Sequence, residues 1–172
     1  LGGVIEPELV DDKINEKTAL VSLFLVNNEI GTINNIKKIC ELAHKKGALV
    51  HCDAAQGLGR VPLNCQDLGV DFLSLSGHKI YGPKGVGALY KKSTVELDPL
   101  IFGGGQEKGI RPGTLNVPGI VGMAFAGDLA VNNLMIETQR IEKLRNSLFN
   151  QLKTIDGVKF NGDNKSKVAG NL

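Results

Sequence analysis

Lys79 is the residue of this sequence whose surroundings best suit covalent chemistry. A lysine in a partly desolvated pocket can lose its proton and attack a carbonyl carbon, which produces a Schiff base. The residues just before it, Ser76, Gly77 and His78, offer a hydroxyl, a backbone amide and an imidazole, and a phosphate group accepts hydrogen bonds from all three. Spacing alone leaves a second explanation open, because most lysines that follow a strand are solvated turn residues.

Asp53 is the acidic residue that could act together with this lysine. Pyridoxal 5'-phosphate carries both an aldehyde and a phosphate group, and its ring acts as an electron sink when a carboxylate keeps the ring nitrogen protonated. Asp53 follows the apolar run 48–52, and Lys79 follows the run 70–75. Two such residues at neighbouring strand ends suggest this cofactor without identifying it.

Four apolar runs predict the strands that would position these residues. They cover residues 19–26, 48–52, 70–75 and 85–90, and the last is expected to pair locally. Between the first two runs, Asn34 or Asn35 can cap a helix that ends at Gly47. A short connecting segment that includes residues 63–68 precedes the third run. This alternation is typical of an α/β fold with a largely parallel sheet.

The carboxyl ends of the strands form the expected binding edge, because ligands of such sheets lie beyond them. Three polar clusters follow the strands there, one with Asn28, one with Asp53 and Gln56, and one with Ser76, His78 and Lys79. We therefore expect these side chains to converge on one site.

The second half of the sequence is predicted to be helical, with one helix near residues 117–130 and a longer one that ends near 156–157. The longer helix has apolar residues at helical spacing, namely Ile141, Leu144, Leu148, Leu152 and Ile155. Residues 158–160 could begin a new strand, and the sequence after them shows no return to a core. We therefore predict one domain over residues 1–156 and the start of a second over residues 157–172.

Charge and cysteine content exclude several classes of protein. The 20 basic and 18 acidic residues give a net charge of +2, which is not the dense positive field that nucleic-acid binding needs. No stretch approaches the roughly 18 uninterrupted apolar residues of a membrane span, and residues 1–3 carry no targeting pattern. Three cysteines without a C-x-x-C pair fit a reducing compartment. We expect a cytoplasmic protein with neither nucleic acid nor a membrane as its partner.

Two other kinds of site can be set aside. The glycine-rich stretch 103–109 lacks the G-x-x-x-x-G-K-[ST] order of a nucleotide-binding loop. His51, Cys52 and Asp53 are neighbours on a predicted strand, so their side chains alternate between opposite faces, and no second ligand pair has zinc spacing. No metal site is therefore expected.

Four segments of the chain resemble those of a known enzyme family. Residues 76–87 are similar to the cofactor-lysine motif of NifS/IscS-type cysteine desulfurases, members of the class V aminotransferase family of fold type I pyridoxal phosphate enzymes. Residues 26–31, 51–56 and 111–116 also resemble that family, in its order and close to its spacing. The resemblance covers essentially the whole chain as the central part of a longer enzyme. It implies that residues 1–156 belong to the cofactor-binding large domain, whose helices lead into a small C-terminal domain.

The resemblance also implies a role for each polar residue of the site. Lys79 would bind pyridoxal 5'-phosphate as a Schiff base and later move protons at the substrate Cα, and Asp53 would pair with the pyridinium nitrogen. The other implied cofactor-binding residues are Gln56 and Asn28 at the phenolic oxygen, with Asn28 also beside the substrate carboxylate, and Ser76, Gly77 and His78 at the phosphate. Thr114 would reach the phosphate of the neighbouring subunit, so a homodimer with shared active sites is implied.

The family's reaction takes sulfur from L-cysteine, releases L-alanine and leaves a persulfide for a sulfur-acceptor or scaffold protein of iron-sulfur cluster or thio-cofactor assembly. The family's attacking cysteine lies well after the segment that contains Thr114, and none of Cys40, Cys52 and Cys65 matches it. We therefore expect this chain alone to release no sulfide from L-cysteine. Two further interpretations stay open: a selenocysteine lyase or other class V lyase or aminotransferase, and a non-catalytic fragment that keeps only the fold and a dimer surface.

Overall fold

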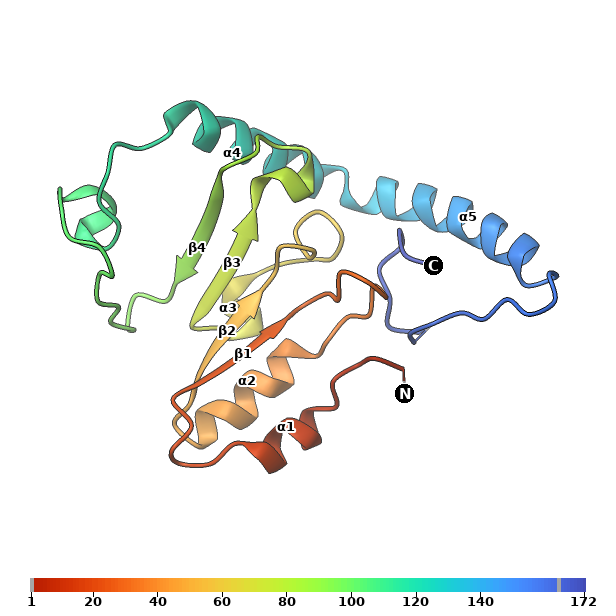
Figure 1. Cartoon of the computed structure of the whole chain (residues 1–172), viewed down its shortest axis with the longest axis horizontal. Coiled ribbons are helices and arrows are strands. Elements are labelled where there is room, and N and C mark those ends of the chain that lie inside the picture. The colour runs from red at the N-terminus through yellow and green to blue at the C-terminus, as the bar shows by residue number, and fades with distance from the viewer. Residues whose placement is uncertain (1, 164) are drawn as a thin grey trace.

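A four-stranded sheet forms the centre of the computed structural model, which describes residues 2–163 and 165–172 (Figure 1). The strands are β1 (Leu20–Phe24), β2 (Leu49–Asp53), β3 (Phe72–Ser76) and β4 (Gly87–Lys91), and they follow this order across the sheet. β1, β2 and β3 are parallel, whereas β4 pairs with β3 in the antiparallel direction. These observations confirm the four predicted strands and the largely parallel α/β sheet.

Helix α2 (Ile36–Lys45) covers one face of the sheet. Asn35 caps it, since the Oδ1 atom of this residue accepts a hydrogen bond from Lys38 N at 3.1 Å. On its inner side, Cys40 of α2 shares one hydrophobic core with Val50 and Cys52 of β2. Helix α1 (Pro7–Lys13) packs on the outer side of α2, and the short helix α3 (Cys65–Leu68) contacts α2 near the sheet. The predicted helix after β1 is thus confirmed.

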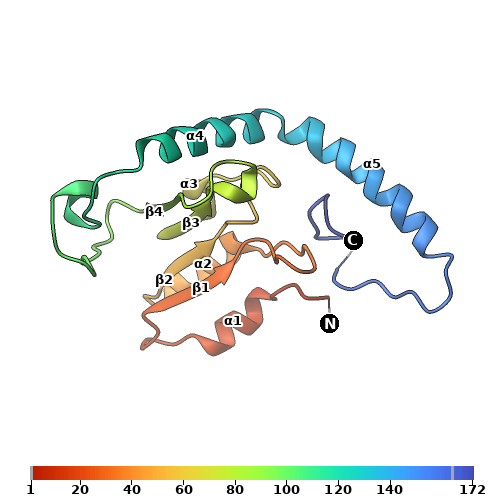
Figure 2. The ribbon, with the colours of Figure 1, turned by 45° about the horizontal axis from the view of Figure 1, so that its top comes forward.

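Helices α4 (Val117–Asn132) and α5 (Leu134–Leu152) form an arc on the side of the sheet opposite α1 (Figure 2). α4 packs against the 3-10 helix η1 (Gly77–Ile80) that follows β3, and α5 continues at an angle of 69° to it. Both predicted helices are present, although the second ends at Leu152 and not near residues 156–157. Among the described residues no single helix is long and apolar enough to cross a membrane, whereas the bent pair α4 and α5 meets that test jointly.

The last residues of the chain return to the core, which contradicts the expectation from the sequence. Val168 is only 7% exposed and belongs to the same core as Val50. Its segment is held by residues 31–33, since Ile33 N donates to Ser166 O at 3.0 Å and Val168 N donates to Gly31 O at 2.9 Å. No strand forms over residues 158–160. A single buried valine in a polar loop produces no hydrophobic periodicity, so the sequence pattern did not indicate this packing.

A buried carboxylate ties three elements of the fold together. Asp71 is 3% exposed, and its Oδ2 atom accepts a hydrogen bond from Val50 N at 2.8 Å and lies 2.7 Å from His44 Nε2 at the end of α2. Its Oδ1 atom lies 3.8 Å from Lys92 Nζ, just after β4. These contacts compensate for burying the carboxylate, and they hold α2 and the end of β4 against β2.

Candidate active site

The predicted site residues follow the carboxyl ends of β1, β2 and β3. In the register of the sheet, Phe24 pairs with Asp53, and Asp53 pairs with Ser74. The three parallel strands therefore end at one edge, where ligands of such sheets bind. The structure thus brings the three predicted polar clusters to a common edge, although Lys79 lines one hollow there and Asn28 and Gln56 line another.

Asp53 presents a free carboxylate at this edge. It is the last residue of β2 and is exposed, whereas its neighbour Cys52 is completely buried on the opposite face. Asp53 Oδ1 accepts a hydrogen bond from Ala55 N at 2.9 Å, which fixes the carboxylate over the turn that follows. No ion pair to Asp53 forms within residues 2–163 and 165–172, so its charge is available to a positively charged ligand group.

Lys79 lies in a tight turn that leaves β3 directly. Gly77 N donates to Val86 O, and Gly82 N donates to Gly77 O, both at 3.0 Å. A Cβ atom on Gly77 would lie 2.9 Å from Val86 Cγ1 and 3.1 Å from the carbonyl oxygens of Pro83 and Val86, so only glycine fits here. The turn is therefore rigid at the point where it presents Lys79.

The surroundings of Lys79 differ from the partly desolvated pocket that Schiff-base chemistry favours. Lys79 and His78 are both exposed, while Ile80 anchors the turn in the interior. Lys79 lines a groove of about 670 Å³ whose apolar wall includes Leu58 and Phe125. Since α4 and the turn after β2 supply these walls, the lysine is flanked on one side and open to solvent on the other.

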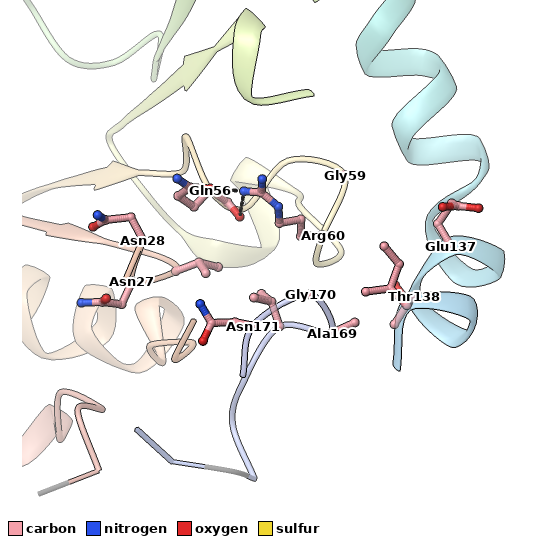
Figure 3. A pocket seen from close by; sticks show the side chains of 13 residues that line it. Asn27, Asn28, Gln56, Gly59, Arg60, Glu137, Thr138, Ala169, Gly170 and Asn171 are labelled. Atoms are coloured by element: carbon pink, nitrogen blue, oxygen red, sulfur yellow. Dashed lines mark hydrogen bonds between the residues drawn. The ribbon is translucent and has the colours of Figure 1, made fainter. Parts of the chain in front are cut away.

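A second hollow, a cavity of about 260 Å³, lies between the turn after β2 and the end of the chain (Figure 3). Two predicted site residues, Asn28 and Gln56, line it together. Thr138 of α5 and residues 168–171 form the opposite walls. Asn171 is held there because its Nδ2 atom donates to Glu29 O at 2.9 Å. The returning end of the chain therefore contributes to the site.

Arg60 is a residue of this cavity that the sequence analysis did not single out. Its Nη1 atom donates to Gln56 O at 3.2 Å and also to Gln56 Oε1 (Figure 3). Successive turns after β2 bring the two residues together, since Gly57 N donates to Ala54 O at 2.8 Å and Arg60 N donates to Gly57 O at 3.0 Å. No local sequence pattern indicates this pair, because the segment is not helical and its course depends on contact with α4.

Thr114 is not brought to these hollows by its own chain. It is exposed and lies between β4 and α4, in a segment that extends away from the sheet (Figure 1, green). The same segment exposes large apolar side chains, because Leu100 is 96% and Phe102 is 85% accessible. Thr114 therefore lines neither hollow of its own chain.

The three cysteines lie on the far side of the sheet from Asp53. Burial raises the pKa of the Cys40 and Cys52 thiols to about 12, and burial also raises the pKa of Cys65. A thiol that keeps its proton is a poor nucleophile and a poor metal ligand. Among the described residues no group of three or more His, Cys, Asp or Glu side chains is placed to hold a metal ion.

Comparison with known proteins now assigns the chain to a family. The sequence pattern described as "Aminotransferase class-V" matches residues 2–171, so the chain belongs to the class V aminotransferase family. Class V aminotransferases and cysteine desulfurases depend on pyridoxal phosphate.

Within that family the chain is most informatively compared with cysteine desulfurases. It is 44% identical over 173 residues to cysteine desulfurase IscS of Rickettsia africae and 44% identical over 174 residues to that of Ehrlichia chaffeensis. Both alignments cover 99% of this chain and 42% of the relative, so the chain spans less than half the length of these proteins.

Solved structures show the same relationship. A NifS-like protein matches with a TM-score of 0.92 and 40% identity, over 98% of this chain and 46% of that one. A NifS-like protein from Rickettsia africae matches with a TM-score of 0.91 and 35% identity, over 98% of this chain and 48% of that one. The fold is therefore that of the NifS-like pyridoxal phosphate enzymes, as the sequence analysis expected.

The donor set at the sheet edge fits this cofactor chemically. A carboxylate without an ion-pair partner suits a pyridinium nitrogen, and an amine on a rigid turn suits an aldehyde carbon. The Ser76 hydroxyl and the His78 imidazole, next to the Lys79 amine in sequence, are donors of the kind that bind a phosphate. The residues at this edge therefore carry the kinds of chemical group that fit pyridoxal phosphate.

Proposed function

We propose that this chain forms the cofactor-holding part of a pyridoxal phosphate-dependent cysteine desulfurase. The observation that carries the proposal is the common sheet edge, which presents the free carboxylate of Asp53 and the rigidly turned Lys79. The relatives named cysteine desulfurase support the substrate, L-cysteine. The product would be L-alanine, with the sulfur passed on as a persulfide.

The chain's own residues divide the work of binding and proton transfer. Asp53 would hold the pyridinium nitrogen, and Gln56 and Asn28 would lie at the phenolic oxygen. Ser76, His78 and Thr114 would bind the phosphate, Thr114 that of a neighbouring subunit. Gly77 would shape this turn and not donate to the phosphate, because its amide already donates to Val86 O at 3.0 Å. The bound cofactor supplies an electron-withdrawing ring that stabilises negative charge at the substrate Cα. Lys79, freed at that stage, would hold the proton that leaves Cα.

Sulfur transfer needs a thiolate beyond these residues. In the proposed step a cysteine thiolate attacks the substrate sulfur, the bond between Cβ and sulfur breaks, and the carbon fragment takes up a proton to become L-alanine. Cys40 and Cys52 are buried with raised pKa values, and Cys65 lies in α3 on the far side of the sheet. The proposal therefore assigns the attacking thiolate to none of the three.

Further parts of the proposal concern assembly. The exposed Leu100 and Phe102, in the same segment between β4 and α4 as Thr114, favour a homodimer in which this segment is covered by a second copy. A sulfur-acceptor or scaffold protein for iron-sulfur cluster assembly would receive the persulfide. We also predict that a small domain starts at residue 157 and that the protein is cytoplasmic.

Borohydride trapping tests the cofactor site. The 172-residue chain is loaded with pyridoxal phosphate, reduced with borohydride, digested and mapped by mass spectrometry. We expect the modification on Lys79 in the native chain and in the control Lys84→Ala, and its loss from this peptide in Lys79→Ala. Modification of Lys84 instead, or an even spread over surface lysines, would contradict the proposed site.

Proton exchange tests the chemistry without requiring the missing thiolate. The loaded chain should catalyse deuterium exchange at Cα of L-alanine in heavy water, followed by NMR. Asp53→Asn should lower this exchange rate at least about 10-fold with much less effect on cofactor affinity, because the amide replaces the charge but keeps the size. An unchanged rate would remove Asp53 from the mechanism, and no exchange in the native chain would favour a non-catalytic fragment. Multiple turnovers of L-cysteine to alanine would contradict the assignment of the thiolate.

A further inference from the structure

The contact between Arg60 and Gln56 is unusual for a half-buried cation. Arg60 lines both the 260 Å³ cavity and the groove beside Lys79. Within residues 2–163 and 165–172 it forms no ion pair, and Glu137, the acid that lines the same cavity, is bound by Arg140 at 2.7 Å. The Nη1 atom of Arg60 instead donates to two oxygens of one neutral residue, Gln56. A cation that contacts only a neutral side chain gains no ion-pair energy, so the contact suggests a role other than stabilising the fold.

The chemistry of the two groups fixes how the Gln56 amide is oriented. A guanidinium has donors and no acceptor, so it can face only the carbonyl oxygen of an amide. Figure 3 shows Gln56 Oε1 on the side of Arg60, and the amide nitrogen therefore points the other way. The structure contains no hydrogen bond from Gln56 Nε2 to another described residue, so both of its protons are available at the cavity that Asn28 also lines.

We propose that Arg60 is a positioning residue of the cofactor site, which turns Gln56 so that its Nε2 group donates to the anionic ring oxygen of pyridoxal phosphate. The inference rests on the proposed function, in which Gln56 lies at that oxygen. A phenolate oxygen only accepts hydrogen bonds, so a flipped amide would bring two negatively polarised oxygens together. Without Arg60 nothing else within the described chain distinguishes the two orientations.

The turn that carries Arg60 is itself fixed by α4. Gly59 has a φ of +72°, and a Cβ atom there would lie 2.7 Å from Ala130 Cβ. The backbone next to Arg60 therefore touches the helix directly. Arg60 is placed by packing and Gln56 is placed by Arg60, so the orientation of the amide is set before any ligand arrives.

A double-mutant cycle tests whether Arg60 acts through Gln56. The variants are Arg60→Met, Gln56→Ala and the two combined, and each is titrated with pyridoxal phosphate by absorbance. Arg60→Met should weaken binding about 10-fold, the usual effect of losing a hydrogen bond to a charged group. It should also raise the pH at which the bound cofactor changes its absorbance. A ring oxygen that has lost the Gln56 donor accepts a stronger hydrogen bond from the lysine nitrogen, so that nitrogen keeps its proton to a higher pH. In the Gln56→Ala background, Arg60→Met should change neither quantity.

Two further variants separate positioning from charge and from folding. Arg60→Lys keeps a cationic donor and should restore most of the affinity and the spectral midpoint. Lys37→Met removes an exposed cation of α2 that lines neither hollow, and it should leave the affinity and the spectral midpoint unchanged. An equal effect of Arg60→Met with and without Gln56, or no effect at all, would overturn the inference while the labelling of Lys79 stands. A native chain that takes up no cofactor at Lys79 would instead refute the proposed function.

Discussion

Replacing Gly59 by alanine should destabilise the fold through two separable effects. The φ of +72° disfavours any residue with a Cβ atom, by about 1–2 kcal/mol. The new methyl carbon would also lie 2.7 Å from Ala130 Cβ, well inside the usual 3.5–4.0 Å of carbon contacts, and such overpacking costs about 1–3 kcal/mol. We expect a total loss of about 2–5 kcal/mol in the free energy of unfolding, measured with urea and circular dichroism.

The chain offers a matched control for the backbone effect alone. Gly47 has a φ of +78°, and a Cβ atom there would meet nothing within 4 Å, so Gly47→Ala should lose only about 1–2 kcal/mol. Removing the opposing methyl group with Ala130→Gly should recover the packing part of the Gly59→Ala loss. Equal losses for Gly59→Ala and Gly47→Ala, with no coupling to Ala130→Gly, would refute the claim that this turn is packed against α4.

Three further predictions address other parts of the fold. Asp71→Ala should lower the free energy of unfolding by about 1–3 kcal/mol, because it leaves the buried Val50 N without an acceptor. Asp98→Ala on an exposed loop should change it by less than about 0.5 kcal/mol, and an equally small effect at Asp71 would contradict the clamp. Cys65 should react with iodoacetamide before Cys40 and Cys52, because burial raises the pKa of those two thiols to about 12. Their raised pKa values add stability that is present below about pH 9 and is lost as the pH rises towards 12. Mass spectrometry of the native and the urea-unfolded chain measures the labelling order, and prompt labelling of Cys52 in the native chain would contradict it. Phe102→Ser should shift the chain towards monomer in analytical ultracentrifugation, while Met135→Ser, an exposed apolar control outside that segment, should not; dimers that persist in both would exclude the segment as the interface.

The strands and their polar ends could be predicted because their signals are local. The run 19–26 is almost continuously apolar and forms a strand, although β1 lies at the edge of the sheet and is only partly buried. Asn35 caps the next helix through a single side-chain bond. The common edge of the carboxyl ends follows, since parallel strands joined through helices end at one edge. The placement of Asp53 and Lys79 at that edge therefore needed no information from distant residues.

Arg60 and Val168 could not be found in that way, because their contacts depend on tertiary structure. Arg60 lies in a turn whose course is set by contact with Ala130 on a helix that forms far later in the sequence. The apolar spacing of α5 was recognised, yet Leu144 and Leu148 are exposed in the structure. Periodicity indicates which residues share a helix face, but it does not indicate what that face contacts.

The wall of the cavity that residues 168–171 form has a consequence for the order in which the molecule assembles. Ser166 Oγ donates to Ile33 O at 3.0 Å across 133 residues of chain. The chain entropy lost on closing a loop of that length costs about 4 kcal/mol of free energy. Contacts between such distant segments therefore form after the local contacts of the sheet. Hydrogen bonds to residues 29–33 and the buried Val168 hold this segment, and local opening begins where stability is lowest. We therefore expect this wall of the cavity beside Asn28 and Gln56 to form after β1 and β2 have paired, and to be able to open without separating them.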